Sequence, residues 1–295
     1  PTPRFSGDLT VPFPLHDSLL SPRKEIYARQ IPNKEGHKNM SRQQALSLFD
    51  YFPATKTLFD ATLNIADELQ HSKAINHTRL KALMTTSLGG SDAEGRWNWG
   101  EAHDTAEAAL VYLLRNNWAR LVGKKRTAVA TVQSLMALET ALPTRTRRAA
   151  ETQQMQQFST PAELAYIAAK AGQIKQGETV REPSCGTGLL AVMADHFGAK
   201  LQLNELSKSR AELVRGVFPK AKVTTLDAEH IDNDCEDEDE TDVVLMNPPF
   251  SVSKNVTNKS QKTSFYHIRS ALNSLGQGGR LVVITSDSFS PETWH

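Results

Sequence analysis

The stretch Glu182-Pro183-Ser184-Cys185-Gly186-Thr187-Gly188 decides the fold of this chain. It follows the short β-type run Thr179–Glu182 and precedes an apolar segment, Leu189–Phe197, with helical spacing. Glycines between a strand and a helix let the backbone approach a ligand at the helix N-terminus, where free N–H groups point outward. The dinucleotide fingerprint G-x-G-x-x-G fails because Ala191 holds its third glycine position, and no Gly-Lys-Ser or Gly-Lys-Thr of a P-loop follows.

Strands and helices alternate around this turn. The expected strands are Thr179–Glu182, Leu201–Asn204, Lys222–Thr225, Asp242–Met246 and Arg280–Thr285. The expected helices are Pro161–Ala171, Leu189–Phe197, Lys208–Val217 and Phe265–Leu275, with a turn at Gly276–Gly279. Such alternation predicts an α/β fold in which a parallel sheet carries helices on both faces.

The part of the chain before residue 151 has a different pattern of apolar residues. Residues 41–150 carry apolar residues at three- to four-residue spacing, in stretches that begin at Ala45, Leu58, Ala106 and Val129, and this predicts an α-helical domain. Residues 1–40 are rich in Pro, Lys and Arg and are expected to form an extended arm or linker. The predicted domains are therefore 1–40, 41–150 and 151–295. Trp97 and Trp99 are expected either to be buried against the helices or to offer a stacking platform for bases.

Composition and charge narrow the class of protein. Hydrophobic residues make up 39% and charged residues 23% of 295 residues, which is typical of a globular protein, and no apolar run is long enough to span a membrane. Residues 1–150 hold 20 Lys and Arg against 14 Asp and Glu, whereas residues 151–295 hold 14 against 19. This asymmetry predicts two parts with different roles.

The N-terminus and the two cysteines lead to further predictions about location, processing and metal binding. The N-terminus lacks the apolar region of a signal peptide, so we expect a cytoplasmic protein, and it lacks Met, so we expect a processed chain or part of a longer one. Cys185 and Cys235 lie 50 positions apart, a spacing that favours neither a zinc site nor a disulfide framework. We expect no metal site.

Two acidic residues close the next two strands. Glu205 lies 17 positions after Gly188, where a carboxylate can accept hydrogen bonds from both hydroxyls of a ribose. Asp227 follows the third strand, where it could accept from the amino group of an adenine. Because parallel strands place their carboxyl ends at one edge, both side chains are expected near the glycine-rich turn.

The fourth strand ends in Asn247-Pro248-Pro249-Phe250. Two consecutive prolines donate no backbone hydrogen bond and stiffen the chain, which leaves the Asn247 side-chain oxygen and the Pro248 carbonyl as fixed acceptors. The Phe250 ring would lie beside them. Two acceptors and an aromatic face suit a planar amino group on a base or an amide.

With these motifs in register, residues 158–289 resemble the class I S-adenosylmethionine-dependent methyltransferases, in the amino-methylating branch that includes DNA adenine-N6 enzymes. The resemblance implies a Rossmann-like sheet, here truncated after its fifth strand, and S-adenosylmethionine as the cofactor. It implies Asn247, Pro248, Pro249 and Phe250 as catalytic residues. It implies the following cofactor-binding residues: Phe158, Thr160, Glu182, Pro183, Ser184, Gly186, Gly188, Glu205, Asp227 and Asn247.

A further resemblance covers nearly the whole chain. Residues 91–95, 142–148 and 156–161 look like the N-terminal region of strawberry-notch-like methylase–helicase proteins, which carry a helicase after the methylase region. The resemblance implies an N-terminal fragment of a larger polypeptide whose partners are DNA and the helicase region that follows. The expected phosphate contacts are Lys124, Lys125, Arg126, Arg145, Arg147 and Arg148.

The function expected from this reasoning is DNA adenine-N6 methylation of a flipped-out base. Two alternatives stay open. Protein-glutamine and RNA methyltransferases use a similar tetrapeptide for planar amino groups. The domain could also bind the cofactor or DNA without catalysis, as an accessory to a helicase or an anti-restriction assembly.

Overall fold

The computed structural model describes residues 56–71, 74–124, 126–145, 159–234, 240–248 and 259–285. The chain divides into two units after Thr55, and all described residues belong to the second, Lys56–His295. The expected arm at 1–40, the helical stretch at Ala45 and the domain boundary near residue 150 lie outside the described residues. Among the residues that are described, no helix is both long and apolar enough to span a bilayer.

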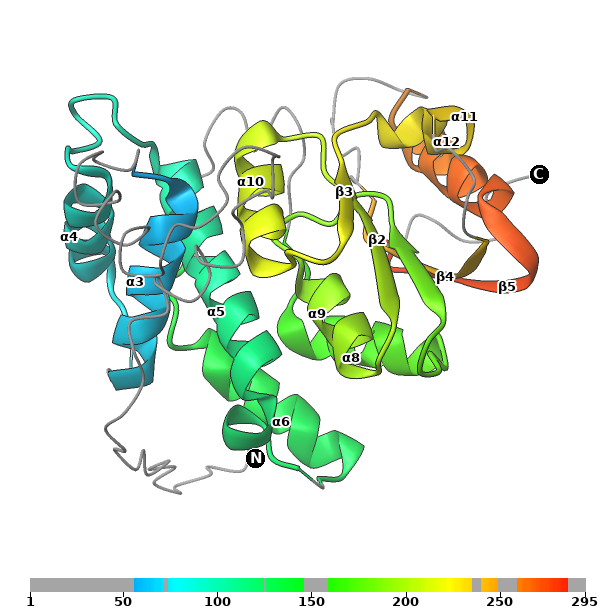
Figure 1. Ribbon diagram of the computed structural model, residues 1–295, viewed down its shortest axis with the longest axis horizontal. Helices are drawn as coiled ribbons and strands as arrows, with labels where there is room; N and C mark the ends of the chain where they lie inside the picture. Colours follow the sequence, from blue (N-terminus) through cyan, green and yellow to red (C-terminus); the bar gives the residue numbers. More distant parts are fainter. Residues whose placement is uncertain are drawn as a thin grey trace, which may run out of the picture. The chain divides into compact units, whose positions relative to one another are not determined.

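A five-stranded parallel sheet forms the centre of the second unit, in the order β3-β2-β1-β4-β5 (Figure 1). Its strands are β1 Thr179–Glu182, β2 Lys200–Asn204, β3 Lys222–Thr224, β4 Thr241–Met246 and β5 Leu275–Val283. The order reverses beside β1, because β2 and β3 extend to one side of it and β4 and β5 to the other. In open sheets of this kind, ligands bind at the carboxyl ends of the strands next to such a reversal.

Helices cover both faces of the sheet and precede it. Those associated with the sheet are α8 Ala162–Ala171, α9 Leu189–His196, α10 Lys208–Val217, the 3-10 helix η1 Ala228–His230, α11 Ile231–Asp234 and α12 Lys259–Asn273. Those that precede it are α3 Leu58–His71, α4 His77–Leu88, α5 Trp99–Leu121 and α6 Ala128–Glu139. Figure 1 shows α11 and α12 together beside β4 and β5.

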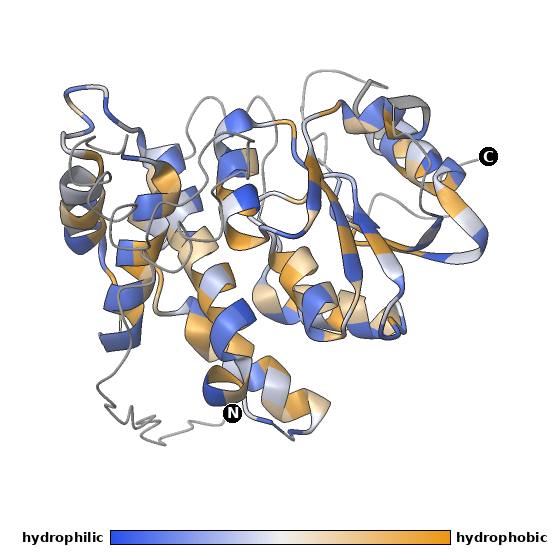
Figure 2. Cartoon of the chain, in the orientation of Figure 1, coloured by the Kyte–Doolittle hydropathy of each residue, from blue (hydrophilic) through white to orange (hydrophobic). Residues whose placement is uncertain are grey.

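Alternate residues of β4 divide the core between the two faces. Val243 and Leu245 pack with α5, α8, α9 and α10 in the larger cluster, whereas Val244 and Met246 pack with Ala271 of α12. Helix α9 is buried along its first six residues and is largely hydrophobic (Figure 2), because it packs against β1, β2, α8 and α5. The expected α/β fold, with a parallel sheet and helices on both faces, is confirmed.

Helix α5 belongs to this core as well as to the helices before the sheet. Leu110 and Leu114 lie in the same cluster as Leu190 and Val243, while Ala102 and Ala106 pack with α3 and α4. Helix α5 therefore has one face toward each group of apolar side chains.

The structure differs from the predicted elements at the starts of β5 and α12, and it decides the position of Trp97. The expected turn at Gly276–Gly279 does not precede the fifth strand, because β5 already begins at Leu275. These glycines lie in a shift of the strand pairing: Leu275 pairs with Thr241, whereas Arg280 pairs with Val243. Helix α12 starts at Lys259, earlier than expected. Trp97 is 3% exposed and its ring nitrogen donates to Gly90 O at 3.0 Å, so the burial interpretation is right for this residue.

Candidate active site

The side chain of Asn204 joins the carboxyl ends of the first three strands. It is 2% exposed, and its Nδ2 donates to Pro183 O at 2.8 Å and to Leu226 O at 2.9 Å. Its Oδ1 accepts from Leu226 N and from the hydroxyl of Thr224, both at 2.8 Å. The loops after β1 and β3 are therefore fixed to the end of β2, since a buried amide with all its partners tolerates little movement.

The glycine-rich loop takes backbone conformations that only glycine adopts readily. Gly186 and Gly188 have φ values of +56° and +97°. A Cβ on Gly188 would lie 2.6 Å from Phe218 Cε2, so this position also requires the absence of a side chain. Gly188 is the N-cap of α9, which directs the start of that helix toward the end of β1.

Glu205 holds this loop from the end of β2. Its Oε2 accepts from Gly186 N and its Oε1 accepts from Ser207 N, each at 2.8 Å. The residue is 6% exposed, and burial raises the pKa of its carboxyl group, against the opposing attraction of Arg210. Each carboxylate oxygen has a second lone pair, so Glu205 can still accept from ligand hydroxyls.

Two further groups of the loop are buried with unusual pKa values. Glu182 is 2% exposed, and its pKa is raised well above the usual value by burial first and by repulsion from Glu205 second. Burial also raises the pKa of the Cys185 thiol, with Glu182 adding to the effect. A buried thiol of this kind is a weak nucleophile, and Cys185 is best understood as a small packing residue.

Asn247 projects from the end of β4 toward the segment that precedes α8. Its Nδ2 donates to Thr160 Oγ1 at 2.9 Å, across 87 positions of sequence, and Thr160 is 8% exposed. Among the described residues, nothing donates to the buried Asn247 Oδ1. Pro248 is buried, whereas Pro249, Phe250 and Phe158 lie outside the described residues.

Thr160, Glu182, the glycine-rich loop and Asn247 line one small cleft of about 20 Å³, and Glu205 adjoins it through its contact with Gly186. Three of its lining residues carry a buried polar atom that has no hydrogen-bond partner within the described part of the chain: Glu182 Oε2, Ser184 Oγ and Asn247 Oδ1. Buried polar atoms in native proteins are nearly always paired, so three of them in one cleft indicate a site for a polar ligand.

A larger cavity of about 200 Å³ adjoins this cleft. The two share Glu107, Ser159, Thr160 and Leu189 in their walls, and the larger one is also lined by residues of α5, α6 and the segment Pro143–Arg145. Helix α5 thus contributes to the wall of the site, although it comes long before the sheet in sequence.

Two carboxylates of α5 belong to the surroundings of the cleft, and the sequence pattern did not reveal them: Glu107 lines it, and Asp104 pairs with a residue that lines it. Asp104 accepts from Arg210 Nε at 2.8 Å and from Arg210 Nη2 at 3.0 Å, and Arg210 lines the cleft. Glu107 accepts a hydrogen bond from the hydroxyl of Thr187 in the glycine-rich loop. Arg145 Nη2 lies 2.5 Å from Asp104 Oδ1 and 3.6 Å from Glu107 Oε2. The two arginines hold the pKa of Asp104 below its usual range despite burial.

The remaining site predictions fall elsewhere. Asp227 is exposed, caps η1 by accepting from Glu229 N at 3.0 Å, and does not line the cleft. Lys124 is exposed, and exposed Arg126 donates to Ser134 Oγ at 2.9 Å. Lys125, Arg147 and Arg148 lie outside the described residues. Across the described ranges, no three His, Cys, Asp or Glu side chains are grouped to hold a metal ion.

Residues 171–293 match the family described as Methyltransferase small domain. This part of the chain is a methyltransferase domain. The match spans less than half of the chain and includes the glycine-rich loop, Glu205 and Asn247, while Thr160 and the α5 carboxylates precede it.

Solved structures similar to the chain include TrmN from Thermus thermophilus, at 17% identity and a TM-score of 0.36, covering 52% of this chain and 55% of that one. They include an S-adenosylmethionine-dependent O-methyltransferase from Thermotoga maritima, at 16% identity and a TM-score of 0.37, covering 48% and 52%. An rRNA methylase from Streptococcus thermophilus has 13% identity and a TM-score of 0.32, covering 43% and 72%. The chain thus spans about half the length of the first two. No curated protein matches it.

The cofactor that a methyltransferase domain implies is S-adenosylmethionine, and the residues of the cleft, together with Glu205 beside it, fit this cofactor chemically. Glu205 offers carboxylate oxygens to a ribose, and the glycine-rich loop offers a backbone that a ligand can approach closely. The unpaired oxygens of Glu182 and Ser184 can bind the polar amino-acid end of the cofactor. The expected convergence of Gly186, Glu205 and Asn247 is present, because Gly186 contacts Glu205 and shares the cleft with Asn247.

Proposed function

We propose that this chain is the DNA adenine-N6 methyltransferase part of a larger methylase–helicase polypeptide. The observation that carries the proposal is the state of Asn247, whose Nδ2 is held by Thr160 while its buried Oδ1 has no partner among the described residues. This oxygen lies in the wall of the cleft that the glycine-rich loop also lines. An acceptor fixed at this place suits an amino group with N–H bonds to donate.

The chemistry explains why such acceptors matter. The amino nitrogen of adenine is a poor nucleophile because its lone pair is delocalised into the ring. Hydrogen bonds from this amino group to Asn247 Oδ1 and to the Pro248 carbonyl would shift the nitrogen toward a tetrahedral geometry with its lone pair directed outward. S-adenosylmethionine, when bound, supplies an electrophilic methyl group.

The residues of this chain therefore act by orientation. Thr160 fixes the Asn247 amide, so its oxygen keeps one direction, and fixed alignment of two reacting groups supplies much of a rate enhancement. Phe250 would stack on the base and contribute roughly 1–3 kcal/mol. A base in a duplex must be flipped out to reach the cleft, which requires a few kcal/mol.

The proposed partners are DNA and the helicase region that would follow in the same polypeptide. Exposed Lys124 and Arg126 are available for phosphate contacts. Arg145 is held by Asp104 and Glu107, so a phosphate would have to compete with two carboxylates for it. We therefore assign the stronger phosphate contacts to the first two residues.

The direct test is methyl transfer from labelled S-adenosylmethionine to DNA, RNA and protein substrates. We expect label in N6-methyladenine of DNA. Label in RNA or in glutamine of a protein would replace the proposed acceptor, and cofactor binding without any transfer would favour an accessory role.

Asn247→Ala tests the role of the free acceptor. We expect it to retain cofactor affinity, measured by calorimetry, and to lose transfer. Asn116→Ala is the matched control, since Asn116 is an exposed asparagine of α5 that donates only to Tyr112 O at 2.7 Å. Transfer at the wild-type rate by Asn247→Ala would contradict the proposed geometry.

A further inference from the structure

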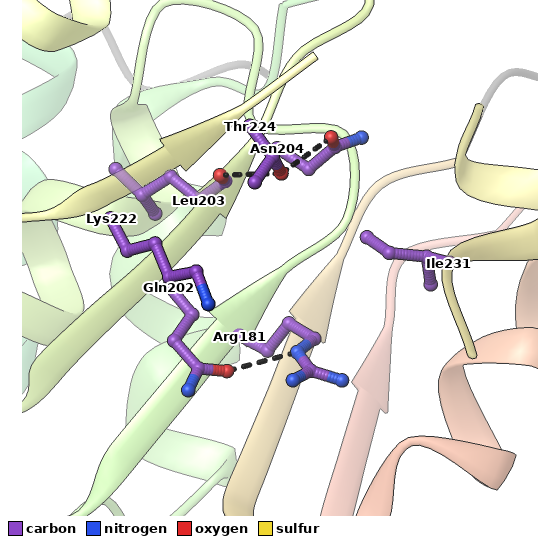
Figure 3. Close-up of a pocket in the computed structure, with 7 residues that line it drawn as sticks. All are labelled: Arg181, Gln202, Leu203, Asn204, Lys222, Thr224 and Ile231. Atoms are coloured by element: carbon purple, nitrogen blue, oxygen red, sulfur yellow. Dashed lines mark hydrogen bonds between the residues drawn. The ribbon is translucent and has the colours of Figure 1, made fainter. Parts of the chain in front are cut away.

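A second pocket, drawn in Figure 3, lies on the sheet and shares no lining residue with the cleft of the candidate active site. Along β1, Glu182 lines the candidate active site whereas Arg181 lines this other pocket, because successive residues of a strand point to opposite faces. Its walls come from three strands and α11, and the lining residues are Arg181, Gln202, Leu203, Asn204, Lys222, Thr224 and Ile231. We call it the Arg181 pocket.

The guanidinium of Arg181 is the central feature of this pocket. Arg181 is 4% exposed, and its Nε donates to Gln202 Oε1 at 3.0 Å, as Figure 3 shows. Its Nη1 is buried and meets no acceptor in the described part of the chain. A guanidinium stays charged at every relevant pH, and a buried charge is stable only when it is paired.

The other lining residues do not supply that pairing. Both charged members, Arg181 and Lys222, are cations, and no carboxylate is among the seven lining residues. The Asn204 oxygen already accepts from Leu226 N and Thr224. The Gln202 oxygen is taken by Arg181 Nε and lies 3.4 Å from the Thr241 hydroxyl. Within the described lining, the pocket thus has two positive charges and no negative one.

We propose that the Arg181 pocket binds an oxyanion, with one carboxylate or phosphate group against Arg181 Nη1 and the exposed Lys222 beside it. The space of about 20 Å³ accepts only one or two oxygen-sized atoms, so the charged end of the ligand enters and the rest extends toward solvent. Arginine binds carboxylate and phosphate oxygens more strongly than neutral acceptors. The site is separate from the cleft at Asn247, and its ligand is independent of the methyl acceptor.

Calorimetric titration with inorganic phosphate and, separately, with acetate tests this proposal. We expect saturable binding to the wild-type chain, at least tenfold weaker binding to Arg181→Met and several-fold weaker binding to Lys222→Met. Arg215→Met is the matched control because Arg215 is an exposed arginine of the neighbouring helix α10 that does not line the pocket. Its affinity should equal that of the wild type, as should that of Asn247→Ala.

The two probes identify the source of the oxyanion. Binding of phosphate alone supports a phosphate-bearing ligand, and competition between acetate and phosphate supports a carboxylate as well. If Arg181→Met does not fold, Arg181→Lys replaces it as a variant that retains the charge. The weaker anion binding of Lys222→Met then tests the proposal. Equal affinity in Lys222→Met, Arg181→Met and the wild type, or no saturable binding of either anion, would overturn the proposal.

Discussion

Replacing Asp104 by alanine removes the carboxylate that joins helix α5 to the methyltransferase domain. Asp104 is 7% exposed and receives three hydrogen bonds, two from Arg210 at 2.8 and 3.0 Å and one from Arg145 at 2.5 Å. Arg210 is 3% exposed, so the substitution leaves its guanidinium buried without its carboxylate. Helix α5 would then be held to α10 mainly by apolar contacts.

The size of the effect follows from that buried charge. Removing one partner of a buried ion pair typically destabilises a protein by about 3–5 kcal/mol. For a unit of this size, each kcal/mol lowers the melting temperature by about 2–4 °C. We therefore expect Asp104→Ala to unfold at a much lower urea concentration and temperature than the wild type.

The stabilising contribution of Asp104 should depend on pH in a definite direction. Two arginines lower the pKa of Asp104 in the folded chain, so its stabilising contribution is complete above the unfolded pKa of about 4 and is lost as pH falls through the folded value. The difference in unfolding free energy between wild type and Asp104→Ala should accordingly shrink in acid.

Urea denaturation at several pH values measures both quantities. Asp67→Ala is the control, because Asp67 is an exposed carboxylate on α3 whose side chain is 76% exposed. A double-mutant cycle with Arg210→Met should show strong coupling, since the second substitution removes the stranded charge. A loss below about 0.5 kcal/mol, the range of ordinary surface substitutions, would refute the reasoning.

Two further predictions use matched substitutions. Gly188→Ala should destabilise the chain more than Gly177→Ala in urea denaturation. Both positions have positive φ, so both substitutions introduce a backbone strain of about 1–2 kcal/mol. A Cβ at position 188 would also lie 2.6 Å from the Phe218 ring, whereas a Cβ at position 177 meets no described atom within 4 Å. Equal losses would show that the ring moves aside. Burial and the nearby Arg145 lower the pKa of His103 from 6.5 to about 4. Between these two pH values the unfolded chain binds more protons than the folded one, so the free energy of unfolding should decrease as pH falls, by up to about 1.4 kcal/mol per pH unit. His103→Gln should flatten this slope and exposed His71→Gln should not; an unchanged slope in His103→Gln would assign the dependence to other groups.

The parallel sheet was predictable because its signals are local. The strands β1 to β4 are short segments that alternate with helical ones, and each lies within one residue of its expected bounds, whereas β5 begins five residues before the expected start at Arg280. The carboxyl ends of parallel strands share one edge, which is why Gly186, Glu205 and Asn247 could be expected to converge.

Helix α4 was missed because its face toward the core is narrow. Only Leu80, Met84 and Ser87 are buried, so its periodicity is weak, yet the capping residues Asn76 and Gly89 mark both ends and could have revealed it. The pairing of Asp104 with Arg210 had no comparable signal. It spans 106 positions, and charged residues on a helix are ordinarily solvated.

A crystal structure of the chain with S-adenosylhomocysteine tests most directly whether the ends of three strands hold one ligand. We expect the ribose hydroxyls against Glu205, the amino-acid end near Ser184 and Glu182, and the sulfur facing the side of the cleft where Asn247 lies. Ligand density that touches neither the glycine-rich loop nor Glu205, or a chain that binds the compound at another surface, would contradict the assigned site.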